Sequence, residues 1–246
     1  KLFYRAFTDT RAPLGTTGTL LLDPSDINLY ATGTDGNIYD ATVYASDLKN
    51  ALIGSSITLN TSAGSGDVTF NAGNYDLTSG TTHSLTILAY SDGMGPQTGH
   101  INILGSTTTI DMSPGASLTL MAGWNGDLAT PARIAYTPGY GNFSMDPLAS
   151  INIPNGTLKL EAAGTLSLGA MTAGTLYGKA GSSITANAVN HVANVSLQSN
   201  GTISYDTNLS GTTHISASSN GGNINIAGDT GSGSIALGSL YAGSGS

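Results

Sequence analysis

Short segments in which every second residue is apolar recur along most of this sequence. Alternation of this kind, rich in β-branched residues and bounded by Gly, Asn, Asp and Ser, is typical of β-strands. We therefore expect an all-β protein. The segments are residues 19–22, 56–60, 67–70, 84–88, 117–121, 150–153, 157–161, 165–168, 182–185, 194–198, 201–205, 214–217, 223–227 and 234–237.

The spacing of these segments narrows the choice of fold. Steps of about eight to eleven residues fit a sandwich, a barrel or a solenoid. Short Gly/Ser/Asn-rich connections, Thr, Ser and Asn at outward positions, and nearly interchangeable strands favour the solenoid. We predict a parallel β-helix, with a β-sandwich as the alternative. The residues expected to point inward are Ile151, Leu158, Leu166, Leu176, Ile184, Val195, Ile203, Ile215, Ile224 and Ile235.

The low charge of the chain agrees with stacked coils. Charged residues make up 9% of the sequence, against about 25% in a typical soluble domain. Like residues lie above one another at about 4.8 Å in such a stack. Stacked charges repel one another, whereas stacked Asn side chains form hydrogen bonds. With three strands to a coil, we expect roughly 25–30 residues per coil.

Two segments depart from the strand pattern. Residues 45–52 have helical spacing of apolar residues and Ser46 as an expected N-cap, which predicts a short helix on the surface between early coils. Residues 123–143 contain Pro, Gly-rich turns and aromatic residues, and we interpret them as a loop insertion. We expect one continuous domain, with β-helix coils over 1–122 and 144–246, cut from a longer protein.

Several motifs carry a resemblance to a known family. They are Thr19–Ile27 (TLLLDPSDI), Ala45–Leu52 (ASDLKNAL), Ser56–Ser62 (SITLNTS), Gly66–Phe70 (GDVTF), Ser84–Tyr90 (SLTILAY) and Gly99–Gly105 (GHINILG). Over roughly residues 15–123 the chain resembles large exoproteins of the filamentous haemagglutinin type, which two-partner systems of Gram-negative bacteria secrete. The resemblance implies a right-handed parallel β-helix, export through an outer-membrane secretion pore, and attachment or aggregation at the outer cell surface.

Composition excludes several classes of function. The chain has no Cys, which removes thiolate metal sites and thiol nucleophiles. Its 7 Lys and Arg residues include no adjacent pair and form no basic stripe, so nucleic acid is not an expected partner. No apolar run approaches the roughly 18 residues of a membrane-spanning helix.

An enzyme is the main alternative to a binding or structural protein. The β-helical enzymes that cut polysaccharides need clustered acids with a basic residue or bound calcium. Most of the 15 acidic residues stand alone beside turn residues, where Asp stabilises the turn. The run Asp35–Asp40 lacks the alternating acids of a calcium loop. We expect no catalytic residue, no metal site and no cofactor.

The loop insertion holds the best candidates for ligand binding. Its aromatic residues are crowded, and aromatic faces stack on sugars and fill hot spots in protein interfaces. The competing interpretation is that they cover the underside of the loop. The candidates are Trp124, Tyr136, Tyr140 and Phe143.

Asn-X-Ser/Thr sequons are also present. In a chain so rich in Asn, Ser and Thr, several of them arise by chance. The candidate glycosylation sites are Asn60, Asn142, Asn155, Asn194, Asn200 and Asn208.

These observations lead to one functional expectation and two alternatives. We expect a segment of a secreted bacterial surface adhesin or stalk that acts in attachment to host cells, cell–cell aggregation and biofilm. Its partner would be a host glycan, a protein receptor or another copy of itself. The alternatives are a β-helical lyase or hydrolase and a structural spacer.

Overall fold

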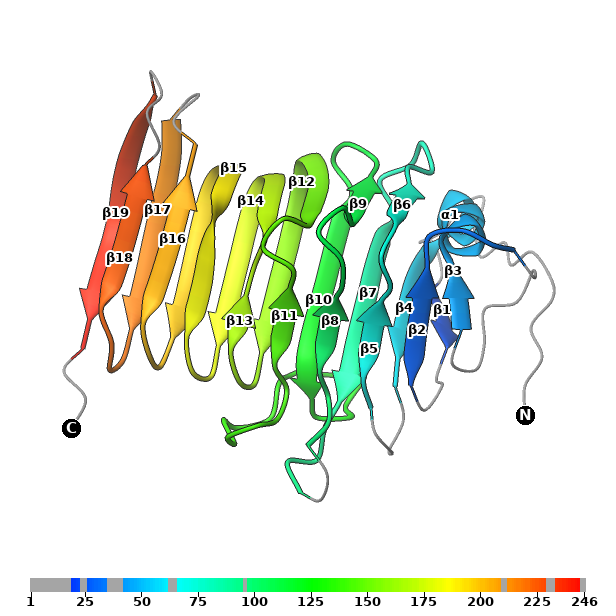
Figure 1. The fold of residues 1–246 in the computed structure, drawn as a ribbon, viewed down its shortest axis with the longest axis horizontal. Helices are drawn as coiled ribbons and strands as arrows, with labels where there is room; N and C mark the ends of the chain where they lie inside the picture. Colours follow the sequence, from blue (N-terminus) through cyan, green and yellow to red (C-terminus); the bar gives the residue numbers. More distant parts are fainter. Residues whose placement is uncertain are drawn as a thin grey trace.

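The computed structural model describes residues 19–22, 26–34, 42–61, 66–94, 97–208, 212–228 and 233–243. Within them the chain forms 19 strands and one helix, α1 (Ala45–Gly54). Every pairing between named strands is parallel, and each strand pairs with strands one coil before or after it. The strands stack from the N-terminal to the C-terminal end of an elongated molecule (Figure 1). The predicted parallel β-helix is confirmed, and the β-sandwich alternative is wrong.

The coil has three faces, which we name A, B and C. Face A contains β1 (Thr19–Leu22), β4 (Ser56–Asn60), β7 (Ser84–Tyr90), β10 (Ser117–Trp124), β17 (Thr212–Ser219), β19 (Ser234–Ala242) and the second parts of β12 (Ser150–Ala162), β14 (Ala170–Ala180) and β15 (Ile184–Ser199). Face B contains β2 (Ile27–Tyr30), β3 (Thr42–Tyr44), β5 (Val68–Phe70), β8 (Ile101–Ile103), β11 (Phe143–Met145), β13 (Leu166–Ser167), β16 (Ile203–Thr207), β18 (Ile224–Gly228) and the start of β15. Face C contains β6 (Asn74–Leu77), β9 (Thr109–Met112) and the starts of β12 and β14.

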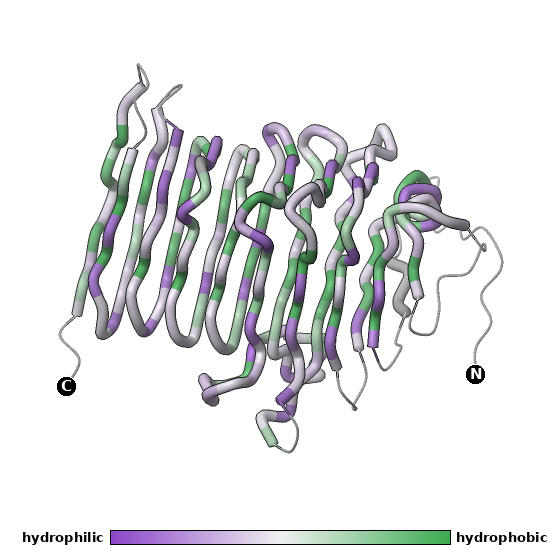
Figure 2. The backbone as a smooth tube through the Cα atoms, viewed as in Figure 1, coloured by the Kyte–Doolittle hydropathy of each residue, from purple (hydrophilic) through white to green (hydrophobic). Residues whose placement is uncertain are grey.

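Apolar residues form continuous rows inside the coil. On face A, Leu85 lies in register with Leu118, which lies in register with Leu158 and then Leu176. All four are fully buried. Figure 2 shows hydrophobic and hydrophilic residues interspersed along many of the strands. The inward positions predicted after residue 150 are buried, except that Ile224 and Ile235, near the C-terminal end, are only partly buried.

The coils are shorter toward the C-terminus than we predicted. The step from Ile57 to its partner Leu85 on the next coil has the predicted length, but the step from Leu158 to its partner Leu176 is much shorter. The following step, to Val195, is similarly short. The coil length expected from the sequence is therefore wrong for this part of the chain, because β12, β14 and β15 each continue from one face to the next without a separate loop.

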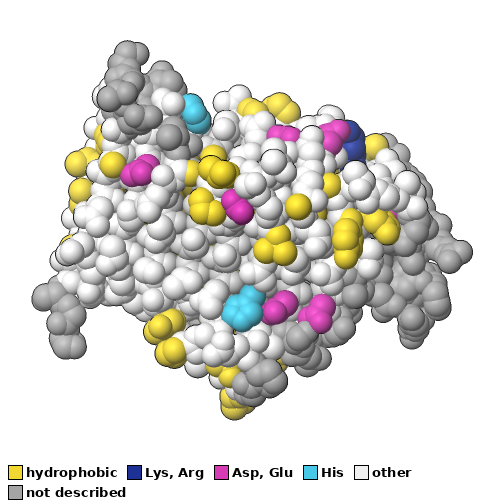
Figure 3. All heavy atoms as spheres, viewed as in Figure 1, with side chains coloured by type: hydrophobic (Ala, Val, Ile, Leu, Met, Phe, Trp, Pro, Cys, Tyr) yellow, Lys and Arg dark blue, Asp and Glu magenta, His cyan; other side chains and the backbone are white. Residues whose placement is uncertain are grey.

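Polar ladders run along the outside of the coil. The Asn220 side-chain amide donates to Asn200 Oδ1, one coil away, at 3.0 Å. The Thr109 hydroxyl donates to Asn74 Oδ1 at 2.6 Å. Figure 3 shows one face, on which charged side chains are scattered over a mostly uncharged surface. Ladders of uncharged groups avoid the repulsion between like charges stacked at strand spacing.

The predicted helix is confirmed, and it ends slightly later than expected, at Gly54. α1 connects β3 on face B to β4 on face A and packs against β6. Its buried side includes Leu48 and Leu52. Ser46 is not the N-cap, because the helix begins after Tyr44 without a side-chain cap. The Ser46 hydroxyl instead donates to the Gly33 carbonyl oxygen at 3.1 Å.

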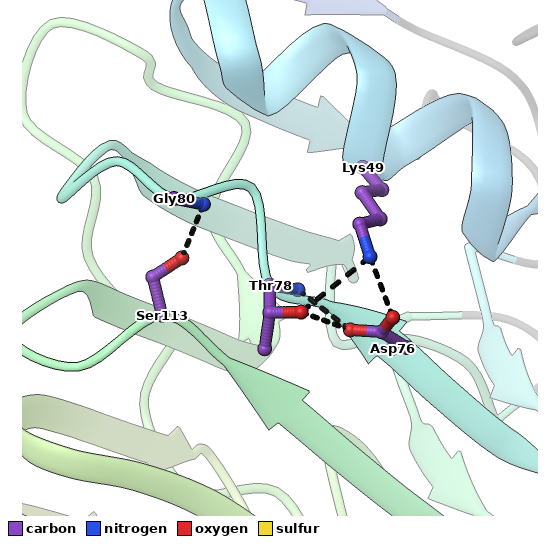
Figure 4. Close-up of polar contacts among 5 residues, drawn as sticks. All are labelled: Lys49, Asp76, Thr78, Gly80 and Ser113. Carbon is purple, nitrogen blue, oxygen red and sulfur yellow. Dashed lines mark hydrogen bonds and ion pairs between the residues drawn. The ribbon is translucent and has the colours of Figure 1, made fainter.

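An ion pair joins the helix to face C. Lys49 Nζ lies 2.5 Å from Asp76 Oδ2 on β6. The other oxygen of Asp76 accepts hydrogen bonds from the backbone N–H and the hydroxyl of Thr78 (Figure 4). In the same view, the Ser113 hydroxyl accepts a hydrogen bond from the N–H of Gly80 at 3.0 Å. These contacts fix the end of β6 against α1 and against the next coil.

Candidate functional site

The segment between β10 and β11, which lies within the loop insertion predicted for residues 123–143 and is called the excursion below, folds back onto the outside of face A. The N–H of Asn125 donates to the Ala132 carbonyl oxygen at 2.9 Å, and the N–H of Ile134 donates to the Gly123 carbonyl oxygen at 2.8 Å. Beneath it, outward-facing apolar side chains form a small second cluster with Trp124. Leu88 and Met121 belong to this cluster and are in register on β7 and β10. The excursion therefore covers apolar side chains on the outside of the coil.

Trp124 is part of that covering layer and not a ligand site. Its side chain is 3% exposed, and its ring meets the Tyr90 ring edge-on at 6.2 Å. Its Nε1–H donates to the Asp127 carbonyl oxygen at 3.2 Å. The ligand-binding role predicted for Trp124 is wrong, because packing and this hydrogen bond occupy both its ring and its polar group.

The other aromatic candidates are divided between the core and the surface. Phe143 is fully buried and lies in register between Ile101 and Leu166 inside face B. The role predicted for Phe143 is therefore also wrong, since its ring packs into the coil. Tyr136 is exposed and Tyr140 is partly buried. For these two residues a binding role stays a prediction.

The candidate glycosylation sites differ in their exposure. Asn60 is 3% exposed, so its amide is out of reach once the coil has folded. Asn142 and Asn208 are partly buried, and the side-chain oxygen Oδ1 of Asn142 accepts a hydrogen bond from the Thr165 N–H at 2.9 Å. The remaining candidates are exposed: Asn155, Asn194 and Asn200. Glycosylation at the exposed positions stays a prediction.

Two acids and a histidine meet at the corner that leads into face B. The Asp26 carboxylate accepts from the N–H of Asp67, and the Asp67 carboxylate accepts from the N–H of His100 at 2.9 Å. His100 Nδ1 accepts from the N–H of Asn142. Burial raises the pKa of Asp67, although the hydrogen bond and charge of His100 oppose this shift. Each side chain holds the backbone of the next coil, which is a structural role.

Among the described residues, no group of three or more His, Asp or Glu side chains could hold a metal ion. The run Asp35–Asp40, considered above as a calcium loop, lies outside the described residues.

A groove on face A brings charged and aromatic side chains together. Lys159 on β12 lies in register with Tyr177 on β14, and Glu161 lies in register with Lys179. The groove has a volume of about 390 Å³, and its lining also includes Gly178, Ser196 and Gln198. This volume is at the lower end of the range of small-ligand sites. The Tyr177 side chain is 50% exposed, so one side of its ring is free to contact a ligand.

A second hollow lies beside this first one, on the side of the excursion. It shares Glu161 and Lys179 with the first hollow and is also lined by residues 131–135, including Arg133. Burial lowers the pKa of the Arg133 guanidinium, and the Glu161 carboxylate opposes that shift. The Arg133 Nε–H is buried without a hydrogen-bond partner in the described part of the chain. We call the two hollows together the face A groove.

The excursion therefore contributes to a surface feature, but with residues other than the expected ones. Tyr136 packs beside Gly181, which closely follows Lys179 in the chain. Lys159 on β12 and the pair Tyr177 and Lys179 on β14 could not be grouped from the sequence, because the two strands are separated in the chain and meet only through the pairing of neighbouring coils. The available signal was a repeated spacing, since the step from Lys159 to Tyr177 equals the step from Glu161 to Lys179 and corresponds to one coil.

Comparisons with known proteins add no assignment: no family model, no curated protein and no solved structure matches the chain. In the described residues, the single helix is too short and too polar to cross a membrane.

Proposed function

We propose that this chain is a segment of a secreted surface adhesin, and that the face A groove is a place where it contacts a glycan. The observation that carries the proposal is a half-exposed tyrosine, Tyr177, set among long polar side chains in a hollow on the side of a rigid solenoid. Aromatic rings stack on the apolar faces of sugars, and surrounding polar groups satisfy their hydroxyls. The resemblance to filamentous haemagglutinin-type exoproteins supports the same function.

The groove favours binding over catalysis. Hydrolysis of a glycosidic bond by the common mechanism needs a pair of carboxyl groups facing the scissile bond. The described residues that line the face A groove include one acid, Glu161, and it forms an ion pair with Lys159 at 2.9 Å. A carboxylate held in this way accepts hydrogen bonds but has no second acid with which to share the reaction.

A binding screen with matched tyrosine variants tests the proposal. We expect the purified chain to bind to a glycan array or to cell surfaces, and Tyr177→Ala to reduce that binding about tenfold, since stacking of one aromatic ring contributes roughly 1–2 kcal/mol. Tyr241→Ala is the matched control, because Tyr241 is also exposed but lies on β19, away from the groove. Circular dichroism should show that both variants remain folded.

The other outcomes separate the alternatives. Equal binding by wild type and Tyr177→Ala would remove the groove as the contact site, and loss in Tyr136→Ala alone would return the site to the excursion. Absence of binding by every form would favour the structural spacer. Appearance of new reducing ends in a bound oligosaccharide would favour the enzyme.

A further inference from the structure

The face A groove concentrates positive charge in an acidic protein. The whole chain has a net charge of −8. Of its Lys and Arg residues in the described ranges, Lys159, Lys179 and Arg133 border the groove, and Lys49 lies elsewhere, on α1. Random placement of so few cations on a long solenoid would scatter them over many coils, so their gathering at one hollow indicates an anionic ligand.

One acid does not neutralise this cluster. Glu161 pairs with Lys159, whose side chain is 44% exposed, and lies opposite Lys179 across β12 and β14. Arg133 approaches Glu161 from the excursion and leaves its buried Nε–H without a partner in the described part of the chain. The groove therefore keeps a net positive charge and donors that an additional carboxylate could satisfy.

The groove also carries the groups that recognise a sugar ring. The half-exposed ring of Tyr177 lies between Lys159 on one neighbouring strand and Ser196 on the other. Gln198 lies beside Lys179 in the adjacent row. Two strand spacings of about 4.8 Å give the groove a width of roughly 10 Å. A short oligosaccharide lying across the strands would place its rings over Tyr177 and its substituents near both lysines.

A peptide ligand fits this surface less well. Extended peptides commonly bind by adding a strand to an open sheet edge. Here β14 is paired with β12 on one side and with β15 on the other, so its backbone groups are already used. A ligand must be recognised through side chains alone, which suits a sugar ring with an apolar face and hydroxyl groups around it.

From these contacts we infer that the face A groove binds saccharides that carry carboxylate groups, such as oligomers of uronic acids. The inference rests on the proposed glycan-binding function and names the class of its ligand. Lys159, Lys179 and Arg133 would bind the carboxylates, Tyr177 would stack on a ring, and Ser196 and Gln198 would bind hydroxyls.

Isothermal titration with matched probes tests the inference. The probes are oligogalacturonate, its uncharged methyl ester and an oligoglutamate peptide. We expect the acid form to bind about tenfold more tightly than the ester, which corresponds to one charge-assisted hydrogen bond. The oligoglutamate peptide should bind more weakly than the acid saccharide, because it has no ring for Tyr177 to contact.

Variants of the charged residues sharpen the test. Lys159→Met and Lys179→Met keep the apolar stems and should each weaken binding of the acid form about five- to tenfold, with little effect on the ester. Glu161→Gln removes the competing anion and should strengthen binding of the acid form. Lys49→Met is the matched control, since it removes a cation on α1, far from the groove, and it should leave the affinity for the acid form unchanged.

Each contrary result has a distinct meaning. Equal affinity for acid and ester, with both lost in Tyr177→Ala, would overturn the inference and leave the glycan-binding function standing. Equal affinity for oligoglutamate would show a general anion site and would also overturn it. If no saccharide binds in titration while adhesion in the array or cell screen still depends on Tyr177, the carboxylate requirement is wrong. If that adhesion is absent as well, the inference and the proposed function both fail.

Discussion

At the scale of single residues, small side chains decide where the chain can leave the coil and return to it. Gly123 lies at the point where β10 ends and the excursion begins, and the pairing with β7 shifts register there. Its φ is +74°, a backbone conformation that residues with a side chain rarely adopt. A Cβ placed on Gly123 would lie 2.5 Å from the Ala163 Cβ. Both the backbone conformation and the lack of space therefore require glycine.

A pair of glycine substitutions separates these two requirements. Gly80 has a similar φ of +75°, but a Cβ added there meets nothing within 4 Å. Gly80→Ala should lower the free energy of unfolding by about 1–2 kcal/mol, the cost of the left-handed conformation. Gly123→Ala should lower it by about 2–5 kcal/mol, because overpacking adds to that cost. Urea unfolding of both variants checks this, and equal losses would mean that the contact with Ala163 relaxes freely.

At the scale of elements, an apolar side and the ion pair between Lys49 and Asp76 hold the helix α1 to the solenoid. The hydrogen bonds from Lys49 and Thr78 lower the pKa of Asp76 to about 2. Because the folded pKa lies below the ordinary value of 3.8, the ionised carboxylate stabilises the fold above about pH 4. This stabilisation is lost as the pH falls toward 2. The side chains are 33% and 54% exposed, so water screens the interaction.

The pH dependence of an Asp76 variant measures this contribution. Asp76→Asn should lower the free energy of unfolding by less than about 1 kcal/mol at pH 6, and the difference should vanish near pH 2. Lys49→Met should cause a similar loss at pH 6, and the double variant should lose less than the sum. A difference of the same size at both pH values would mean that charge on Asp76 does not contribute.

At the scale of the whole molecule, each coil is stabilised mainly by the coils on either side. Leu176 and Leu237 occupy the same inward row of face A, which runs through Val195 and Ile215. Leu176 is fully buried between neighbouring coils, whereas Leu237 on the last described strand is 57% exposed. The same side chain at the same position of the coil therefore contributes according to its neighbours.

Truncation of these two leucines tests that dependence. Leu176→Ala should lower the free energy of unfolding by about 2–5 kcal/mol, because it removes buried methyl groups and leaves a cavity. Leu237→Ala should lower it by less than about 1 kcal/mol, since its side chain buries little area in this chain. The measurement is the urea midpoint for each variant, and a large effect of Leu237→Ala would indicate that another surface covers the row.

Much of this architecture could be predicted because a strand has a simple period. Alternation separates inward from outward side chains within a few residues, so Leu158, Leu166 and Ile184 could be assigned to the core before any contact was known. The helix could be predicted from its own spacing. Strands with little apolar alternation were harder to predict. On β14 only the inward position of Leu176 was predicted, because its other inward positions include small residues such as Ala173 and Gly178.

The sequence by itself determined the class of fold, the inward rows and the low charge that stacking requires. Only the tertiary structure decided which outward residues become neighbours. Which outward residues meet depends on the number of residues in each coil, and backbone pairing and the geometry of the corners set that number. A shift of one residue in the pairing would turn every side chain of the strand to the other face of the sheet. The short coil after β12 places Lys159 beside Tyr177 and Glu161 beside Lys179. No local pattern encodes the length of that coil, because its energy comes from hydrogen bonds and packing between coils.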